Sequence, residues 1–238
     1  MKILFLILIF FIYEIYQLSF IKVKKIKIKL GFRAVQISDY HNSPFINLKL
    51  LNKKLKKINP QIIFLTGDII SRDTKNFQRA EKFIKALKIR EDIKILFVKG
   101  NHEYDNRKYG EFLKILRKHK IILLDKNPLE YKNVKIYGED FESFQNLKLE
   151  KGKNILLTHA PEKAIDGRNF NLILAGHTHG GQVRFPILGQ VIGNNFKLFP
   201  KYSMGLYKIN KSLLYVDGGL GGKINFRILD PVGITVIE

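Results

Sequence analysis

The chain contains no cysteine, and its 21 acidic residues are outnumbered by 42 lysines and arginines in a length of 238 residues. Without cysteine, neither a disulfide framework nor a thiolate metal site is possible, so any bound metal must be held by oxygen and imidazole. The formal charge of +21 suits phosphate-bearing partners such as anionic lipids and phosphoesters, although a genome bias toward Lys, Ile and Asn explains it equally well. No nucleic-acid-binding motif is recognisable, so nucleic acid is not an expected partner.

The N-terminus is the longest apolar run. Residues 3–13 are all apolar or aromatic, and this character continues to Ile21 with interruptions at Glu14, Gln17 and Ser19. The segment is just long enough to cross a bilayer of about 30 Å at ~1.5 Å per residue. A glutamate in the bilayer core costs about 2.5 kcal/mol or more, which favours a shallower interfacial anchor. No A-x-A cleavage site is present, which argues against a removed signal peptide.

Lysines alternate with apolar residues directly after this run. Lys22, Lys24, Lys25, Lys27 and Lys29 follow it, whereas only Lys2 precedes it. The positive-inside bias therefore predicts a membrane-associated protein whose folded domain is cytoplasmic. The same alternation suits the first strand of that domain. We expect a hydrophobic membrane anchor over residues 1–21 and one folded domain over residues 22–238.

Short aliphatic runs alternate with helix-length segments through the first part of the domain, which is typical of an α/β fold with a buried sheet. The periodicity predicts helices at 44–58, about 75–89 and roughly 107–118, and strands at 61–66, near 121–124 and 134–137, and at 234–237. Beyond Gly181 the composition turns to Gly, Pro, aromatic and β-branched residues. This change predicts a β-rich half whose sheet packs on the first.

Two segments of that half keep alternative interpretations. Residues 182–204 mix aromatic, aliphatic and basic side chains, and they either dip into a membrane interface or fold back as a hairpin. The glycine-rich residues 217–222 favour a tight turn over a phosphate cradle.

Five of the six histidines lie in short polar clusters that directly follow strand-like runs. The clusters are Asp39-Tyr40-His41, Gly67-Asp68, Gly100-Asn101-His102-Glu103, Thr158-His159 and Gly176-His177-Thr178-His179. In open α/β sheets, sites form beyond the carboxyl ends of strands, so we expect these clusters to converge. The sixth histidine, His119, follows a predicted helix and is assigned no role.

The residue types in these clusters suit phosphoester hydrolysis. Two divalent cations about 3.5–4 Å apart lower the pKa of a shared water and clamp the phosphoryl oxygens. Mn²⁺, Fe²⁺ and Zn²⁺ accept mixed carboxylate, amide and imidazole ligands, and the two oxygens of a carboxylate can bridge two ions. The seven candidate ligands are Asp39, His41, Asp68, Asn101, His159, His177 and His179. Taken alone, Asn101 or His159 suits an ordinary turn equally well.

The five clusters, in this order, resemble the motif blocks of the calcineurin-like metallophosphoesterases over residues 34 to about 236. The resemblance implies a four-layer α/β/β/α sandwich of two mixed β-sheets flanked by helices. It also implies a metal-dependent phosphohydrolase with two divalent metal ions, Mn²⁺ foremost and Fe²⁺ or Zn²⁺ as alternatives.

The resemblance further implies roles for individual residues. Asp39, His41, Asp68 and His179 would hold one metal, and Asp68, Asn101, His159 and His177 the other. Asp68 would bridge the two ions. His102 would donate a proton to the leaving oxygen or stabilise the transition state, and Glu103 would orient its imidazole.

The chain departs from the family pattern in two places. Where the second block often continues as Gly-Asp-x-x-Asp, the last position is Ser71, with Asp73 two residues further on, which puts the packing of that loop in doubt. Near the C-terminus Arg227 matches an arginine of the pattern, but Pro231 is followed by Val232 rather than Glu. Arg227 is therefore only a weak candidate for substrate contact.

Gly180-Gly181-Gln182 with Pro186 and Gly189 is similar to a bacterial branch that has N-terminal anchors or export signals and includes enzymes that cleave UDP-2,3-diacylglucosamine in lipid A synthesis. The expected function is thus a membrane-associated phosphodiesterase or pyrophosphatase acting on a phosphorylated lipid or nucleotide-lipid. One alternative is a phosphodiesterase or nuclease for soluble substrates. A non-catalytic scaffold ranks last, because all seven ligand positions are filled.

Overall fold

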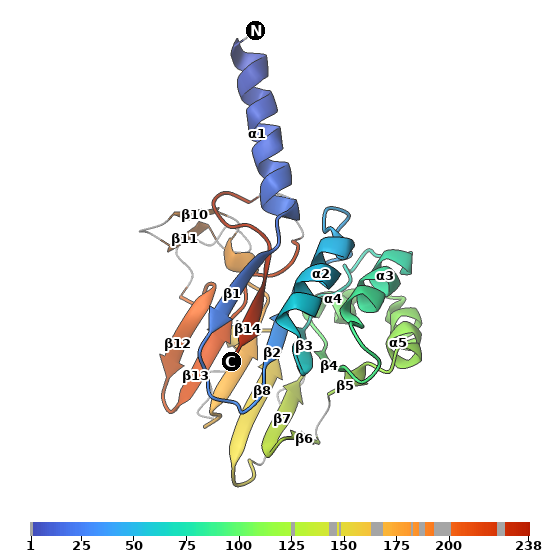
Figure 1. Ribbon diagram of the computed structural model, residues 1–238, viewed down its shortest axis with the longest axis vertical. Helices are drawn as coiled ribbons and strands as arrows, with labels where there is room; N and C mark the ends of the chain where they lie inside the picture. The colour runs from blue at the N-terminus through green and yellow to red at the C-terminus, as the bar shows by residue number, and fades with distance from the viewer. Residues whose placement is uncertain are drawn as a thin grey trace.

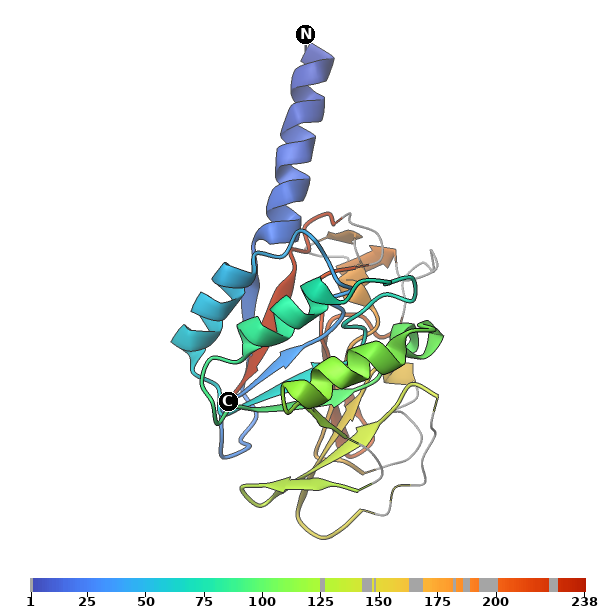
Figure 2. The same cartoon turned by 90° about the vertical axis from the view of Figure 1, so that its right-hand side faces the viewer.

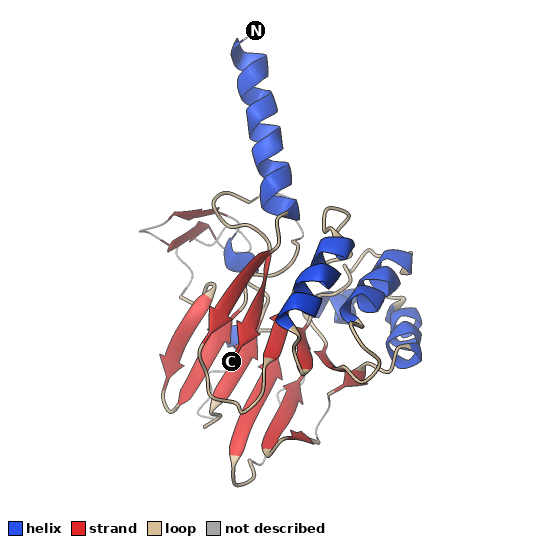
Figure 3. Ribbon diagram, in the orientation of Figure 1, coloured by secondary structure: helices blue, strands red, loops and turns tan. Residues whose placement is uncertain are grey.

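Two six-stranded mixed sheets lie face to face, and a single long helix, α1 (Lys2–Ser19), projects from one end of the molecule (Figure 1). The computed structural model describes residues 2–124, 127–142, 147, 149–162, 169–181, 183–185, 189–192, 201–222 and 227–238. Apart from α1, the longer helices gather on one side of the sheets, as the colouring of Figure 3 makes plain.

The first sheet contains the runs of aliphatic residues from the N-terminal half. Its order is β1 (Lys22–Ile26), β14 (Gly233–Ile237), β2 (Ala34–Ile37), β3 (Ile62–Thr66), β4 (Lys94–Val98) and β5 (Ile122–Leu123). Strands β2 to β5 are parallel, and β14 runs antiparallel to β2 and parallel to β1. Every residue of β2, β3 and β14 is buried, which matches the near-continuous apolar sequence of strands covered on both faces.

The second sheet is assembled from the middle and the C-terminal part of the chain. Its order is β12 (Gly205–Ile209), β13 (Ser212–Val216), β9 (Leu172–Ala175), β8 (Lys153–Thr158), β7 (Val134–Glu139) and β6 (Leu129–Tyr131). The four central strands are parallel, and the two edge strands are antiparallel to their neighbours. A separate hairpin, β10 (Val183–Phe185) and β11 (Gly189–Ile192), lies near the base of α1 (Figure 1).

Helices α2 (Leu48–Ile58), α3 (Gln78–Leu87) and α5 (Tyr109–Lys118) cover the outer face of the first sheet (Figure 2). Their apolar faces bury Leu51, Phe83 and Phe112 against it. A second core lies between the sheets, where Phe64 packs with Leu157. Each such side chain contributes about 1.5–3 kcal/mol by leaving water, so these two layers fix the relative position of the sheets. The outer face of the second sheet has its own apolar cluster, packed against loop residues such as Leu149 and Tyr202.

The predicted α/β fold class is confirmed, with two mixed sheets and helices; among the described residues, α2, α3 and α5 cover the outer face of the first sheet. The helix expected at 44–58 begins only at Leu48. The reason is local, because the side chain of Asn47 accepts a hydrogen bond from the Leu50 N–H at 3.0 Å and so caps the helix there. The helix ends at Ile58 as predicted, where Asn59 adopts a left-handed conformation with φ 49°.

The prediction that the sheet of the β-rich half forms from residues beyond Gly181 is wrong in extent. The second sheet already begins with β6 and β7, and the last strand, β14, lies inside the first sheet between β1 and β2. Its pairing is set by burial, since Thr235 and Gln36 face each other in register and neither is exposed to solvent. Hydrophobic periodicity and composition are local features, so they could not predict that β14 pairs with β1 and β2.

Helix α1 has two different environments along its length. By length and composition it is apolar enough to cross a membrane, and the side chains of residues 3–12 are 45–75% exposed. Glu14, Gln17 and Leu18 are instead buried against the folded domain. The glutamate expected to interrupt a bilayer span therefore lies at a protein contact. The anchor boundary at residue 21 stays a prediction.

Candidate metal centre

The five clusters converge at one edge shared by the two sheets. In the first sheet, Asp39 and His41 follow β2, Asp68 follows β3, and Asn101 and His102 open the short helix α4 (Asn101–Asp105) after β4; in the second sheet, His159 follows β8 and His177 and His179 follow β9. Parallel strands end at a common edge, so side chains up to 140 residues apart become neighbours, as the sequence predicted.

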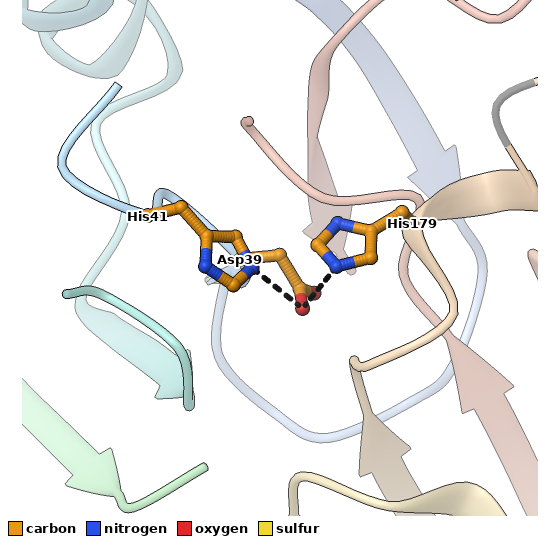
Figure 4. A group of neighbouring side chains, drawn as sticks. All are labelled: Asp39, His41 and His179. Carbon is orange, nitrogen blue, oxygen red and sulfur yellow. Dashed lines mark ion pairs between the residues drawn. The ribbon is translucent and has the colours of Figure 1, made fainter. Parts of the chain in front are cut away.

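Asp39, His41 and His179 form the first cluster (Figure 4). Oδ1 of Asp39 lies 3.7 Å from Nε2 of His179 and 3.9 Å from Nε2 of His41. Two ligands that share one ion at about 2.1 Å lie about 3–4 Å apart, so the spacing fits a common cation. Within the described part of the chain, both ring nitrogens of His41 and Nδ1 of His179 are buried without a hydrogen-bond partner. Orphaned imidazole nitrogens of this kind suit metal ligation.

Asp68, His159 and His177 form the second cluster. Nε2 of His159 lies 3.2 Å from Oδ2 of Asp68 and 3.1 Å from Nδ1 of His177. On the other side of the ring, Nδ1 of His159 donates to the carbonyl of Thr66 at 2.8 Å. That bond places a proton on Nδ1 and directs Nε2 into the cluster, as metal-binding histidines are commonly held.

Asp68 lies between the two clusters. Its Oδ2 is 3.6 Å from Nε2 of His41 as well as close to His159, and its Oδ1 accepts the backbone N–H of His102 at 2.9 Å. The side-chain oxygen of Asn101 is enclosed and finds no hydrogen-bond partner among the described residues. The donor set of carboxylate, amide oxygen and imidazole therefore fits two divalent cations that share Asp68.

The titration behaviour of the first cluster agrees with this fit. Burial lowers the pKa of His41 to about 3 and holds that of His179 well below its usual value, so both rings are neutral with free lone pairs. Burial also raises the pKa of Asp39 to about 7, and the charge of Asp68 adds to this although His159 opposes it. The buried carboxylates of Asp39 and Asp68 would be stabilised by cations bound between them and the histidines.

In the second cluster, burial acts to lower the pKa of His159, but the charge and hydrogen bond of Asp68, the charge of Asp39 and the carbonyl of Thr66 together raise that pKa to about 10. For Asp68, burial acts to raise the pKa of the carboxyl, but His159, His41 and His102 together lower that pKa below its usual value. A cation at Nε2 of His159 would take the place of that proton.

His102 reaches the same region but is held differently from the other histidines. Its Nε2 lies 4.0 Å from Oδ2 of Asp68, and its ring centroid is 4.5 Å from that of His41. Its Nδ1 accepts the backbone N–H of Arg72 at 3.2 Å. A neutral ring that accepts at Nδ1 carries its proton on Nε2, so this atom is a donor toward the cluster. This favours a proton donor over a metal ligand.

Glu103 has partners other than the imidazole that the sequence suggested. Its Oε2 accepts the N–H groups of Asp68 and Gly100, both at 2.8 Å, and its Oε1 accepts those of Ile69 and Ile70 at 2.7 and 3.1 Å. Glu103 thus joins the backbones of the second and third blocks, while the ring of His102 is held by Arg72. The carboxylate is a positioning group for the ligand-bearing loops.

The ligand-bearing backbone is locally strained. Five of the seven candidate ligands have φ between 51° and 73°, in the sparsely populated left-handed region: Asp39, His41, Asp68, His177 and His179. Each such residue costs on the order of 1–3 kcal/mol and persists only where its surroundings enforce it, which is typical of functional sites. At Gly67, a Cβ would lie 2.5 Å from Nδ1 of His159, so only glycine permits this approach of the two loops.

The two departures from the family pattern have structural explanations. The hydroxyl of Ser71 donates to the carbonyl of His41 at 3.1 Å, and the amide of Asn106 donates to the carbonyls of Ser71 and Thr74 at 2.8 and 3.0 Å. The loop is therefore packed without an aspartate at position 71. Arg227 is 1% exposed and its guanidinium binds the carbonyls of Gly218 and Gly221. The suggestion that Arg227 contacts substrate is therefore wrong.

The structure also locates the two segments for which the sequence left alternative interpretations, residues 182–204 and 217–222. Within 182–204, the described residues 183–185 and 189–192 pair as the β10–β11 hairpin, and 182, 186–188 and 193–200 lie outside the described residues. Residues 217–222 form the loop that leaves β13 and passes Asp39. His119 ends α5 with its Nε2 2.9 Å from Oε1 of Glu81, a surface pair away from the clusters.

Comparison with known proteins agrees with this geometry. Residues 32–181 match the calcineurin-like phosphoesterase family model. An uncharacterized metallophosphoesterase of Bacillus subtilis, YkuE, is 29% identical over 227 residues, covering 87% of this chain and 78% of its own. A zebrafish protein named as a transmembrane protein with metallophosphoesterase domain is 27% identical over 80% of this chain, which spans only 49% of its length. The UDP-2,3-diacylglucosamine pyrophosphatase LpxG of Chlamydia muridarum is 22% identical, covering 87% and 83%.

Among solved structures, TT1561 of Thermus thermophilus superposes with a TM-score of 0.52 at 13% identity, covering 79% of this chain and 90% of that one. This likeness concerns the fold. The match of the family model to more than half of the chain and the paired His/Asp clusters identify the chain as a member of the calcineurin-like phosphoesterase family and a metal-dependent phosphohydrolase.

Proposed function

We propose that the protein is a membrane-associated phosphodiesterase or pyrophosphatase that uses two divalent cations, Mn²⁺ foremost, to cleave a phosphorylated lipid or a nucleotide-lipid such as UDP-2,3-diacylglucosamine. The observation that carries the chemistry is the place of Asp68, within 3.6 Å of His41 and 3.2 Å of His159. When bound, the two cations supply an activated water and positive charge for the phosphoryl oxygens.

Asp39, His41, Asp68 and His179 would hold one cation, and Asp68, Asn101, His159 and His177 the other. The carbonyl of Thr66 holds the ring of His159 in the tautomer that this requires. Glu103 keeps the loops of Asp68 and Asn101 at a fixed separation. The chain's own contribution is therefore a rigid frame that brings nucleophile and phosphorus into one geometry.

His102 would donate its Nε2 proton to the leaving oxygen. A pocket of ≈ 310 Å³ opens beside its ring, lined by His41, Ser43, Arg72 and Gly222 among others. This pocket is where we place the leaving group, because a donor must lie within about 2.6–3.2 Å of the oxygen that it protonates. The guanidinium of Arg72, which lines this pocket and lies 3.1 Å from Asp105, would offer N–H donors to a second phosphate.

The lipid side of the proposal rests on α1 and on the naming of a relative. Residues 3–12 of α1 are exposed and apolar, and the helix is long enough for a membrane. The LpxG relative is named for a UDP-linked diacylglucosamine, which joins a diphosphate to a lipid. The cytoplasmic orientation remains part of the proposal. Three of the lysines that suggested this orientation, Lys22, Lys24 and Lys25, belong to strand β1 of the folded domain.

A substrate panel tests the proposal. Full-length protein in lipid vesicles would be given UDP-2,3-diacylglucosamine, a nitrophenyl phosphodiester, a cyclic nucleotide and DNA, each with Mn²⁺ and with chelator. We expect Mn²⁺-dependent release from the lipid substrate and no release by Asp68→Asn. Preference for the cyclic nucleotide or DNA would favour the soluble-substrate alternative. Absence of metal-dependent turnover on every substrate would contradict the proposal.

A further inference from the structure

A buried arginine joins the end of α1 to the loops that carry two of the proposed metal ligands. The backbone N–H of Arg227 donates to Oε2 of Glu14 at 3.0 Å, and both residues are shielded from solvent. Two further hydrogen bonds hold the same junction, from the N–H of Val232 to the carbonyl of Gln17 at 3.0 Å and from the N–H of Leu229 to the hydroxyl of Tyr13 at 2.8 Å. The last turns of α1 are thus built into the domain.

The guanidinium of Arg227 continues this connection to the glycine loop, defined as residues 218–221. Its Nη2 donates to the carbonyls of Gly218 and Gly221 at 2.9 and 2.5 Å. Between them, the N–H of Leu220 donates to the carbonyl of Ser38 at 2.9 Å, directly before Asp39. Arg227 therefore fixes both ends of a loop that is itself bonded to the first ligand-bearing segment.

The glycine loop packs on Asp39 without space for side chains. Gly219 has φ 78°, and a Cβ there would lie 2.9 Å from Cβ of Asp39. A Cβ at Gly221 would lie 2.5 Å from the carbonyl oxygen of Tyr40. Because the loop touches the Asp39–Tyr40 backbone this closely, a shift of the loop would displace Asp39.

A second branch leads from Arg227 to His179. Nη1 of Arg227 lies 3.2 Å from Oδ2 of Asp230, and both side chains are at most 2% exposed. The carboxylate of Asp230 occupies the space that a Cβ of Gly180 would need, so it packs on the residue after His179. The two branches meet at the first cluster, to which Asp39 and His179 belong. No contact in either branch involves His159 or His177 of the second cluster.

From these contacts we propose that α1 is a structural part of the metal centre as well as an anchor. Glu14 and Arg227 are positioning residues that set the geometry of the Asp39–His179 cation site. Neither residue itself lines the pocket beside His102. It follows that a chain shortened at residue 21 loses part of the frame of its active site.

The inference rests on the proposed role of Asp39 and His179 as ligands, so its test combines a metal-free readout with metal titration. The variants are Glu14→Ala, which removes the acceptor for the Arg227 N–H, and Glu14→Gln, which keeps an oxygen acceptor. Glu111→Ala, on the exposed side of α5, is the control. All are made in the full chain, in detergent micelles, with thermal unfolding measured to establish that each is folded.

In Glu14→Ala without metal, we expect amide hydrogen exchange of Gly219 and Leu220 to accelerate at least about tenfold, since their loop loses its fixed support. In Mn²⁺ titrations, one of the two bound equivalents should weaken by about tenfold and the other remain unchanged. Glu14→Gln and Glu111→Ala should match the wild type in both measurements.

Unchanged amide exchange in folded Glu14→Ala would contradict the claim that Glu14 supports the glycine loop. Faster exchange with both Mn²⁺ affinities unchanged would contradict the claim that this support sets the metal site. If the wild type itself binds no Mn²⁺, it is the proposed function that fails, and the exchange result alone decides the junction. Arg227→Lys gives a second route, because a single ammonium nitrogen with three N–H donors cannot replace the two guanidinium nitrogens that together contact four acceptors, on Gly218, Gly221 and Asp230. It should reproduce the Glu14→Ala result.

Discussion

The backbone N–H of Arg72 donates a hydrogen bond of 3.2 Å to Nδ1 of His102. This contact sets the tautomer of the ring, because the remaining proton of a neutral imidazole then lies on Nε2. The opposite arrangement holds at His159, whose Nδ1 donates to the Thr66 carbonyl and whose Nε2 is directed into the cluster. Two histidines of one site are thus held by opposite backbone contacts, which suits the proposed proton donation by His102 and the proposed metal binding by His159.

His102→Ala should lower kcat by about 10²–10⁴-fold on substrates with a poor leaving group, because no proton reaches the departing oxygen. The loss should be much smaller with a nitrophenyl diester, whose leaving group departs as the anion. Bound metal should stay at the wild-type amount. His119→Ala, at the surface pair with Glu81, is the matched control and should keep full activity. Loss of metal in His102→Ala would make this residue a ligand instead.

Glu103→Gln should destabilise the protein, since one oxygen that accepts two buried N–H groups is replaced by an NH₂ donor. Each buried N–H left without an acceptor costs about 1–3 kcal/mol. Urea unfolding measures the change, with Glu111→Gln on the surface of α5 as the control for loss of a carboxylate. Equal stability of the two variants would show that Glu103 does not support the loops.

Acid should selectively weaken the contribution of Glu81. Hydrogen bonds from Lys118 and His119 lower the pKa of its carboxyl to about 2, below the value of about 4.5 expected in the unfolded chain. A lowered folded-state pKa gives stability that is present above pH ~4.5 and is lost as the pH falls toward 2. The difference in thermal midpoint between wild type and Glu81→Gln should therefore be larger at pH 6 than at pH 3. A difference independent of pH would contradict this pairing.

Replacing three exposed apolar residues of α1 should release the protein from membranes. Phe5, Leu8 and Phe11 are 56–64% exposed, and burial of each contributes about 1.5–3 kcal/mol. Changing all three to Ser should reduce partition into lipid vesicles by more than about a hundredfold in a sedimentation assay. Turnover of the nitrophenyl diester should persist, because the Glu14 junction is intact. Leu206→Ser, on β12, is the control for loss of an exposed apolar side chain. Unchanged partition of the triple variant would exclude α1 as the anchor.

The sequence predicted the reaction centre better than the frame around it. Asp39, Asp68 and His159 each follow a strand-like run directly, and the common edge of parallel strands then brings them together. The choice of neighbours for β14 could not be predicted, because Thr235 and Gln36 are 199 positions apart and their pairing depends on burial rather than on local pattern.

The supporting residues carry weaker signals. Glu103 lies beside His102 in sequence, which suggested a partnership between the two, yet its carboxylate is directed to the backbone of another loop. Glu14 stood out only as a polar interruption of an apolar run. Its partner Arg227 lies 213 residues away, and the two meet only because α1 docks on the segment before β14. Side-chain to backbone contacts of this kind leave no periodic trace in a sequence.

The central claim is that Asp68 joins two cation sites, and metal stoichiometry measured together with turnover tests it most directly. Chelator-treated full-length protein would be titrated with Mn²⁺ while bound metal and hydrolysis of a nitrophenyl diester are followed. We predict two bound equivalents, turnover that appears only as the second binds, and loss of both equivalents in Asp68→Asn. Full turnover in chelator, or an Asp68→Asn variant that keeps two ions and full activity, would contradict it.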